Sequence, residues 1–252
     1  MKKLLAVVVA VMVVTGGWAQ SAVAQQEQAK GAPVEFYGCN WQKGMGIADL
    51  VKVGKKFSQW ADKNDSKYSA WILTPQYQTD MGFDVGWLGG WPDGAAMGKS
   101  MDTWLSGGHQ LAREFDAVID CSKHHELATA VAVNAPKQPP GSGIVMFAGC
   151  ELLDGKSGPD AIAAHKKVAD MMVGKGSKAS SWAFFPGLGN TDSNIDYWQV
   201  VAFNNYSEFG VASDIFINGG GWRESVDIFR GVTRCGRGVM FDATLVRAGD
   251  SS

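Results

Sequence analysis

Two aspartates have the clearest potential for chemistry in this sequence. Asp84 and Asp196 each open a stretch that is otherwise rich in apolar residues. If both face one interior space, the two carboxylates would shift each other's pKa and could orient a bound molecule or take a proton from it. The alternative is that each aspartate accepts a hydrogen bond from a backbone amide at a hairpin, as Asp does readily at turns.

Three tryptophans are the candidate walls of the same space. Trp71, Trp87 and Trp182 are three of ten tryptophans among 252 residues. Indole rings suit an apolar or cyclic ligand, whereas the alternative is that they simply fill a close-packed core. We therefore predict a ligand site formed by Trp71, Trp87 and Trp182, with Asp84 or Asp196 near its mouth.

The remaining reactive residue types give weaker signals. His124 and His125 follow Cys121 in an expected loop, and His165 stands beside two lysines on an expected helix, which is typical of a solvent-exposed histidine. No arrangement of a serine or cysteine nucleophile is present, and the glycine pairs lack the spacing of a nucleotide-binding loop. The sequence therefore predicts no metal, no cofactor and no identifiable catalytic residue.

The surroundings of these residues occur twice in the chain. Trp71 recurs as Trp182 at a displacement of 111, and the two aspartates stand 112 residues apart. The segment 102–108, DTWLSGG, returns as 214–220, DIFINGG, also at 112. The offset changes only where loops can absorb a residue or two, which indicates a diverged tandem duplication.

Each copy is expected to follow the order β-α-β-β-α-β. In the first copy we expect strands at 34–39, 68–74, 83–88 and 130–133, with helical regions at 47–61 and 95–119, the latter broken near 107–108. In the second we expect strands at 144–150, 181–185, 195–203 and 239–246, with helices at 159–173, 206–217 and 224–229. Residues 134–143 hold three prolines and two glycines and read as a linker. This order is typical of an α+β ferredoxin-like unit with strand order 4-1-3-2.

Four cysteines are divided equally between the two copies. Three pairings are possible, but the duplication favours Cys39–Cys121 and Cys150–Cys235, because each copy then closes its own loop. The expected topology also brings each pair to one end of neighbouring strands. Zinc is the alternative, although no C-x-x-C pair is present and no histidine has ligand spacing beside a cysteine.

The N-terminus has the order of a secretory signal peptide. Two lysines precede an apolar run, and small residues before Gln25 fit a cleavage site, so residues 1–24 are expected to be removed on export to the periplasm or beyond. A membrane anchor is the alternative, but the run is shorter than the ~20 residues that span a bilayer.

After cleavage, 21 basic side chains face 25 acidic ones, a formal charge of −4, which argues against nucleic acid and anionic membranes as partners. No later stretch is expected to span a membrane. The expected domains are 25–137 and 138–252.

The expected strands are apolar on both faces, as Val34, Phe36, Leu73 and Phe184 illustrate. Sheets of that kind need a second layer, which two tandem units can supply by packing sheet to sheet. In element order and duplication the sequence resembles the dimeric α+β barrel superfamily, which includes antibiotic-biosynthesis-monooxygenase-like and NIPSNAP-like domains, and it resembles exported bacterial proteins of that type. The resemblance implies a pseudo-dimeric barrel, a haem-ligand position near His165 in some relatives, and cofactor-independent enzymes in others. No catalytic motif of the superfamily is matched, so no site residue is carried over.

Three functions are compatible with these features. The first is an exported protein that binds an apolar or aromatic small molecule between the sheets. The second is a cofactor-independent enzyme, monooxygenase-like or isomerase-like, that uses the same cavity. The third is a structural or protein-interaction module with a filled core. A tryptophan-lined cavity favours the first two, and a solid interior favours the third. The sequence specifies neither the ligand nor the oligomeric state.

Overall fold

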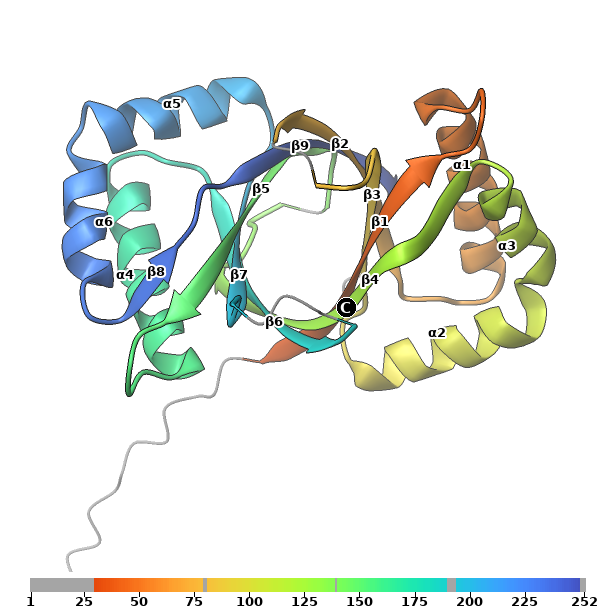
Figure 1. The fold of residues 1–252 in the computed structure, drawn as a ribbon, viewed down its shortest axis with the longest axis horizontal. Coiled ribbons are helices and arrows are strands. Elements are labelled where there is room, and N and C mark those ends of the chain that lie inside the picture. The colour runs from red at the N-terminus through yellow and green to blue at the C-terminus, as the bar shows by residue number, and fades with distance from the viewer. Residues whose placement is uncertain (1–29, 79–80, 139, 190–193, 250–252) are drawn as a thin grey trace, which may run out of the picture.

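The computed structural model describes residues 30–78, 81–138, 140–189 and 194–249, so the expected signal peptide lies outside the described residues. Eight antiparallel strands close into a barrel in the order β7-β6-β4-β1-β3-β2-β9-β5, with β5 pairing back to β7 (Figure 1). A ninth, short strand, β8, pairs with β5. The strands are β1 (Gly31–Trp41), β2 (Ser69–Tyr77), β3 (Val85–Gly90), β4 (Ile119–Asn134), β5 (Gly143–Leu152), β6 (Ser180–Leu188), β7 (Tyr197–Phe203), β8 (Thr233–Cys235) and β9 (Val239–Arg247).

Each half of the chain supplies four neighbouring strands of this barrel. The first half contributes β4-β1-β3-β2 and the second contributes β6-β7-β5-β9. The halves meet at two hydrogen-bonded seams, β4–β6 and β2–β9. The two sheets therefore do more than pack face to face, because their edge strands are paired into one closed wall that leaves no open edge.

Helices cover the outside of the barrel in two groups. The helices α1 to α3 lie against one side and α4 to α6 against the opposite side (Figure 1). They are α1 (Ile47–Lys63), α2 (Gly94–Gly107), α3 (His109–Asp116), α4 (Gly158–Gly174), α5 (Tyr206–Ile217) and α6 (Gly221–Phe229). Several begin at classical capping residues: Asp93 accepts from the Ala96 amide, and Ser157 forms a reciprocal capping box with Asp160. The expected break near Gly107 separates α2 from α3.

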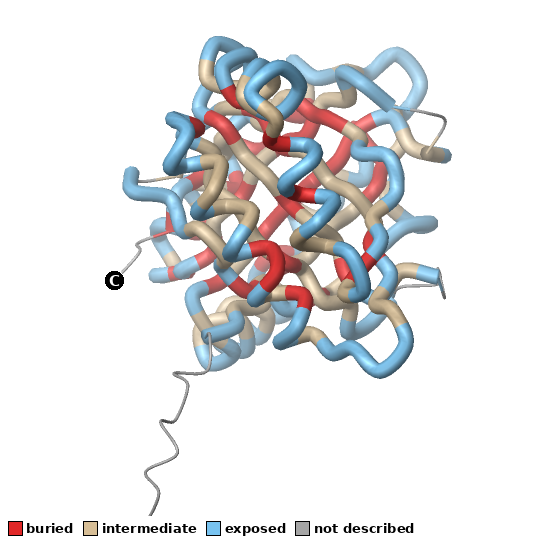
Figure 2. The backbone as a smooth tube through the Cα atoms, turned by 90° about the vertical axis from the view of Figure 1, so that its left-hand side faces the viewer, coloured by how far each residue is buried: buried red, intermediate tan, exposed pale blue. Residues whose placement is uncertain are grey.

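Buried residues, red in Figure 2, lie along the strands and at intervals along the helices. One apolar cluster fills the space between the first sheet and its helices, where Leu50, Val53, Phe57 and Ala61 of α1 recur at helical spacing. A second cluster lies inside the barrel, and a smaller third lies under α4. The barrel interior and the helix layers are thus separate apolar compartments.

Both predicted disulfides are confirmed. Cys39 bonds to Cys121 and Cys150 to Cys235, at sequence separations of 82 and 85 residues. Cys121 lies within β4, which begins at Ile119 and is far longer than the strand expected at 130–133. Disulfides of this kind are typical of oxidising compartments. Within the described ranges, no helix has both the length and the apolar character needed to cross a membrane.

Candidate functional site

A cavity of about 820 Å³ occupies the end of the barrel where the two halves are joined. Its walls come from both sheets, and the segment between β4 and β5 crosses its mouth. The indole Nε1 of Trp71 donates to the Gly141 carbonyl at 3.0 Å, which fixes this segment against β2. The linker recognised in the sequence is therefore part of the cavity's rim.

Trp71 and Trp182 both line this cavity. Each stands on a strand next to a residue that is fully buried on the opposite, helix-facing side, Ile72 and Ala183 respectively. Because side chains alternate along a strand, the neighbouring tryptophans face the barrel interior. Phe184, two positions after Trp182, also lines the cavity.

Trp87 does not line the cavity, because its position in β3 faces the other way. The next residue, Leu88, reaches the interior, so Trp87 is directed towards the helices. There its ring packs edge-on against Phe57 and Phe115, at centroid distances of 5.6 and 5.2 Å. Its Nε1 donates to the Tyr68 hydroxyl at 2.8 Å.

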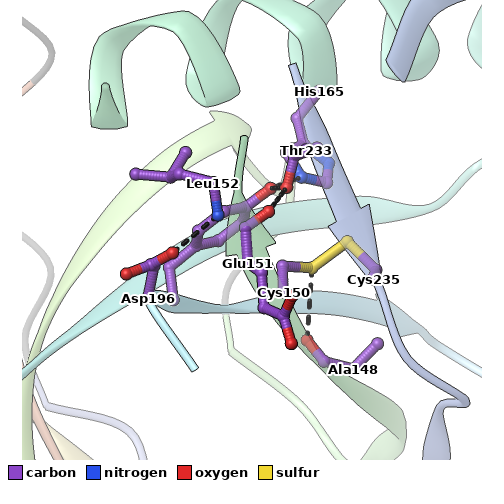
Figure 3. Close-up of a disulfide and its surroundings, with 9 residues drawn as sticks. Ala148, Cys150, Glu151, Leu152, His165, Asp196, Thr233 and Cys235 are labelled. Atoms are coloured by element: carbon purple, nitrogen blue, oxygen red, sulfur yellow. Dashed lines mark hydrogen bonds between the residues drawn. A yellow bond between two sulfur atoms is a disulfide. The ribbon is translucent and has the colours of Figure 1, made fainter. Parts of the chain in front are cut away.

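Neither Asp84 nor Asp196 lines the cavity, and both side chains are exposed at strand starts. Asp84 Oδ2 accepts from the Trp41 amide at 3.0 Å, and Asp196 Oδ2 accepts from the Leu152 amide at 2.6 Å (Figure 3). The amide of each aspartate donates to the carbonyl of Cys39 or Cys150. This is the backbone-holding role that the sequence left open as the alternative to a ligand role.

Two polar side chains at the cavity rim, those of Asn134 and Glu208, are engaged with the protein itself. Asn134 Nδ2 donates to the Ala179 carbonyl at 2.6 Å. Glu208 Oε2 accepts from the amide and the side chain of Asn204, at 3.2 and 3.0 Å. The surface offered to a ligand is therefore mainly aromatic and aliphatic, as in most small-molecule pockets.

Aromatic rings fill the barrel beyond the cavity and form its floor. Phe184 contacts Phe147, which contacts Phe36 and Phe241, with centroid separations between 5.9 and 6.3 Å. His124 packs edge-on to Phe36 at 5.5 Å, and burial lowers the pKa of this imidazole. The expectation of a loop at His124 and His125 is wrong, since both lie in β4.

His165 lies on the buried face of α4, so the expectation of a solvent-exposed histidine is also wrong. Its Nε2 is 2.8 Å from the Tyr197 hydroxyl, which is 2.8 Å from Thr233 Oγ1, and that hydroxyl donates to the Glu151 carbonyl (Figure 3). Burial lowers the pKa of His165 to about 4, so the ring is neutral near pH 7. The two lysines that follow His165 in the sequence gave no signal for this inward orientation.

The environment of His165 does not fit a metal or haem ligand. A ring nitrogen lies within 4.8 Å of the sulfurs of Cys150 and Cys235, but those sulfurs are bonded to each other. The Nε2 atom is occupied by Tyr197, and the ring packs against Phe229 at a centroid distance of 4.7 Å. His165 lines neither the barrel cavity nor the second cavity considered below.

A partly buried polar group in the first half was missed by the sequence reasoning. Glu35 of β1 accepts from Tyr68 Oη at 2.5 Å and from Tyr37 Oη at 3.0 Å. The available signal was a single charged residue inside the apolar, aromatic run 34–39. A charge at such a place is rarely buried without partners, and the two tyrosines are those partners.

Comparison with known proteins places the fold. No protein-family model matches the chain, and no curated protein matches it. A candidate monooxygenase from Lactobacillus acidophilus NCFM has a TM-score of 0.57 at 11% identity, over 87% of this chain and 98% of that one. A candidate monooxygenase from Fusobacterium nucleatum subsp. nucleatum ATCC 25586 has a TM-score of 0.59 at 5% identity, over 88% and 95%. A candidate chlorite dismutase has a TM-score of 0.53 at 11% identity, over 88% and 97%.

These similarities extend over nearly the whole length of each of the three proteins. At sequence identities this low, they show a shared fold alone. The fold is that of the dimeric α+β barrels, as the sequence resemblance implied. Likeness at this level does not carry the neighbours' activities over to this chain.

Proposed function

We propose that this chain is an exported small-molecule-binding protein that holds an apolar or aromatic ligand inside the barrel, between the two sheets. The observation that carries the proposal is the cavity of about 820 Å³ with Trp71 and Trp182 in its walls. That volume falls in the range of pockets that enclose small organic ligands, about 300–1,000 Å³. An open interior of this size weighs against the filled-core module.

The polarity of the cavity supports binding over catalysis. The two aspartates that were candidates for proton transfer hold backbone amides instead. Glu208 is the carboxylate at the rim, and it is engaged with Asn204. A cofactor-independent enzyme remains the second candidate, because proteins with this fold include candidate monooxygenases and an anthrone oxidase-like protein.

The origin and location of the protein belong to the same proposal. Two units at 25–137 and 138–252, derived from one ferredoxin-like ancestor and related to NIPSNAP-like domains, account for the repeated residues and for the two four-stranded halves. Removal of residues 1–24 on export accounts for the two disulfides.

Native mass spectrometry of the exported protein tests the proposal directly. We expect an excess mass that is released on denaturation and identified as an apolar or aromatic molecule. Titration with N-phenyl-1-naphthylamine, an uncharged aromatic probe, should quench tryptophan fluorescence. If a released compound is converted to another on incubation with fresh protein, the enzyme reading replaces simple binding.

A cavity-filling variant locates the site. Ala202→Phe places a ring into the cavity, and Ala95→Phe places the same ring on the exposed side of α2 as a control. We expect Ala202→Phe to abolish probe binding and Ala95→Phe to preserve it. Equal binding by both variants and the parent, with no excess mass, would refute a ligand in the barrel.

A further inference from the structure

A second cavity, of about 340 Å³, lies outside the barrel wall in the first half of the chain. It is bounded by β1, β4 and α2, on the side of the sheet that faces the helices, and by Leu188 and Gly189 at the end of β6. Its lining includes one carboxylate, aromatic rings and two thioethers, from Glu35, Tyr37, Trp91, Met97, Met101 and His125. None of these residues was used in the proposal for the barrel interior, although the Trp91 ring borders both cavities.

The carboxylate of Glu35 is held in place by two phenols. Tyr68 donates to Oε1 at 2.5 Å and Tyr37 donates to Oε2 at 3.0 Å. Burial, followed by the charge of Glu35, raises the pKa of both phenols, so the tyrosines keep their protons and remain donors. With both oxygens accepting, Glu35 is arranged to be an anion, while its burial raises the pKa of the carboxyl group.

The position of Tyr68 is itself fixed by its neighbours. Its hydroxyl accepts from Trp87 Nε1 at 2.8 Å, and its ring packs on Trp91 at a centroid distance of 4.7 Å. A Cβ at Gly89 would stand 1.7 Å from the Tyr68 hydroxyl, so only glycine leaves room for this ring. The Glu35 carboxylate is therefore fixed by a rigid hydrogen-bond network, unlike the carboxylate of a mobile surface side chain.

Among the described residues, the Glu35 carboxylate has hydrogen-bond donors but no ion-pair partner. The ion pairs among the described residues do not include Glu35. Glu126 also borders the cavity, but its carboxylate accepts from Trp198 Nε1 at 3.2 Å, and His125 is the nearby imidazole. A partly buried carboxylate without an ion-pair partner is unfavourable, and a cation in the adjacent cavity would offset that cost.

The other walls also suit a cation. Indole and phenol faces attract an ammonium group, with the strongest effect where the group is desolvated. The thioethers of Met97 and Met101 supply polarisable, adaptable apolar contacts. We propose that this cavity binds a small organic ammonium ion, with its charge against Glu35 and its carbon groups against Trp91, Tyr37, Met97 and Met101.

The second half of the chain argues against a purely structural role for Glu35. At the repeat offset of 111, Met146, Ala148 and Ala179 stand where the first half has Glu35, Tyr37 and Tyr68. The corresponding strand β5 forms and pairs without any of these polar groups. The acid–phenol network is thus a feature of the first half alone and is not required by the fold.

A pair of probes of nearly equal shape tests the charge requirement. Choline carries a quaternary ammonium, and 3,3-dimethyl-1-butanol is its uncharged isostere. Isothermal titration of the full exported chain should show saturable binding of choline. The isostere should bind about tenfold more weakly or worse, since it lacks the attraction to Glu35.

Two variants and one control locate the binding. Glu35→Gln keeps the side-chain shape and removes the charge, and we expect about a tenfold or larger loss of choline affinity. Met101→Trp fills the cavity without altering the carboxylate and should also abolish binding, which keeps the test valid if Glu35→Gln fails to fold. Glu151→Gln removes one exposed acid on the other half and should leave affinity unchanged.

The outcomes are distinct from those of the barrel proposal. Ala202→Phe, which blocks the barrel cavity, should leave choline binding intact. Absence of saturable choline binding, equal affinity for the uncharged isostere, or unchanged affinity in both Glu35→Gln and Met101→Trp would each overturn the inference.

Discussion

At the scale of single residues, Trp87 and Trp91 are two buried indoles in the same half whose N–H groups differ in hydrogen bonding. The exposed fractions of their side chains are similar, 7% and 5%. Trp87 Nε1 donates to Tyr68, whereas Trp91 Nε1 has no hydrogen-bond acceptor among the residues that the structure describes. A buried donor without an acceptor costs free energy, so the two N–H groups contribute with opposite sign.

Replacing each indole by phenylalanine should expose that difference. Trp87→Phe and Trp91→Phe both lose ring volume, but Trp87→Phe also loses a hydrogen bond that holds Tyr68. We expect Trp87→Phe to lower the free energy of unfolding by about 1 kcal/mol more than Trp91→Phe does. Urea unfolding of the two variants gives this difference, and equal losses would show that the Trp87–Tyr68 bond contributes nothing.

His165 should make stability depend on pH. Its pKa is about 4 in the folded chain against an ordinary value of 6.5, so the unfolded chain binds the proton more tightly. Above pH 6.5 the neutral histidine therefore costs the folded state no free energy. As the pH falls from 6.5 towards 4, the free energy of unfolding decreases by up to about 1.4 kcal/mol per pH unit. His165→Gln should flatten the unfolding free energy over this window. The same pH dependence in parent and variant would contradict the assignment.

The direction of individual side chains was the least predictable part of the site. Composition and duplication identified Trp71, Trp87 and Trp182 together, but alternation along β3 turns Trp87 to the helices while Leu88 takes the interior place. Glu35 was overlooked because one of its two partners, Tyr68, is 33 residues away in the sequence, just before β2. Such partnerships are set by strand register, which a single sequence does not specify.

At the scale of elements, the ends of strands carry much of the architecture. Asp84 and Asp196 each bind the backbone just beyond a bridged cysteine, at corresponding places in the two halves. The element order, the break near Gly108 and both bridges were predictable because turn residues and the residues repeated at offsets of 111–114 mark them. A Cβ at Gly108 would stand 2.5 Å from the Trp104 ring, which explains a glycine at that break.

The length of β4 was not predictable from its composition. Its first part, 119–125, is polar and includes His124 and His125, so it lacks the apolar pattern of a strand. It is held there by pairing with β1, and its last part then pairs with β6 of the other half. Tertiary pairing thus overrides local propensity.

One disulfide joins the end of β1 to the start of β4, and the other joins the end of β5 to the short strand β8, so each should stabilise its own half. Closure of loops of 82 and 85 residues is worth about 4 kcal/mol per bridge in the chain-entropy model, with native strain and residual structure reducing it. We expect the double variants Cys39→Ala/Cys121→Ala and Cys150→Ala/Cys235→Ala each to lose about 2–4 kcal/mol of unfolding free energy. Chemical denaturation under non-reducing conditions measures the loss. An unchanged midpoint in either variant would show that its bridge adds no stability.

At the scale of the whole molecule, closure of the barrel depends on two equivalent seams. One joins β4 to β6 and the other joins β9 to β2, so each pairs the last strand of one half with the second strand of the other. Both cavity walls meet across these seams, which makes the barrel cavity a product of the two halves together. The cavity beside Glu35 lies mainly against strands and a helix of the first half.

Separation of the halves tests this account. A fragment of residues 25–137 retains β4 and β2 but loses both partners, so it exposes two strand edges and the apolar inner face of its sheet. Because its own β4 is suited to pair with the β2 of a second copy, the fragment should form a two-fold dimer that restores a closed barrel, or aggregate where pairing fails. Light scattering coupled to size-exclusion chromatography gives the mass, with the complementary fragment 138–252 as the matched control. Mixing the two fragments should recover a one-to-one complex with the N-phenyl-1-naphthylamine response expected of the intact chain. A fragment that stays monomeric and melts cooperatively would show that the seams are dispensable and that each half is an independent domain.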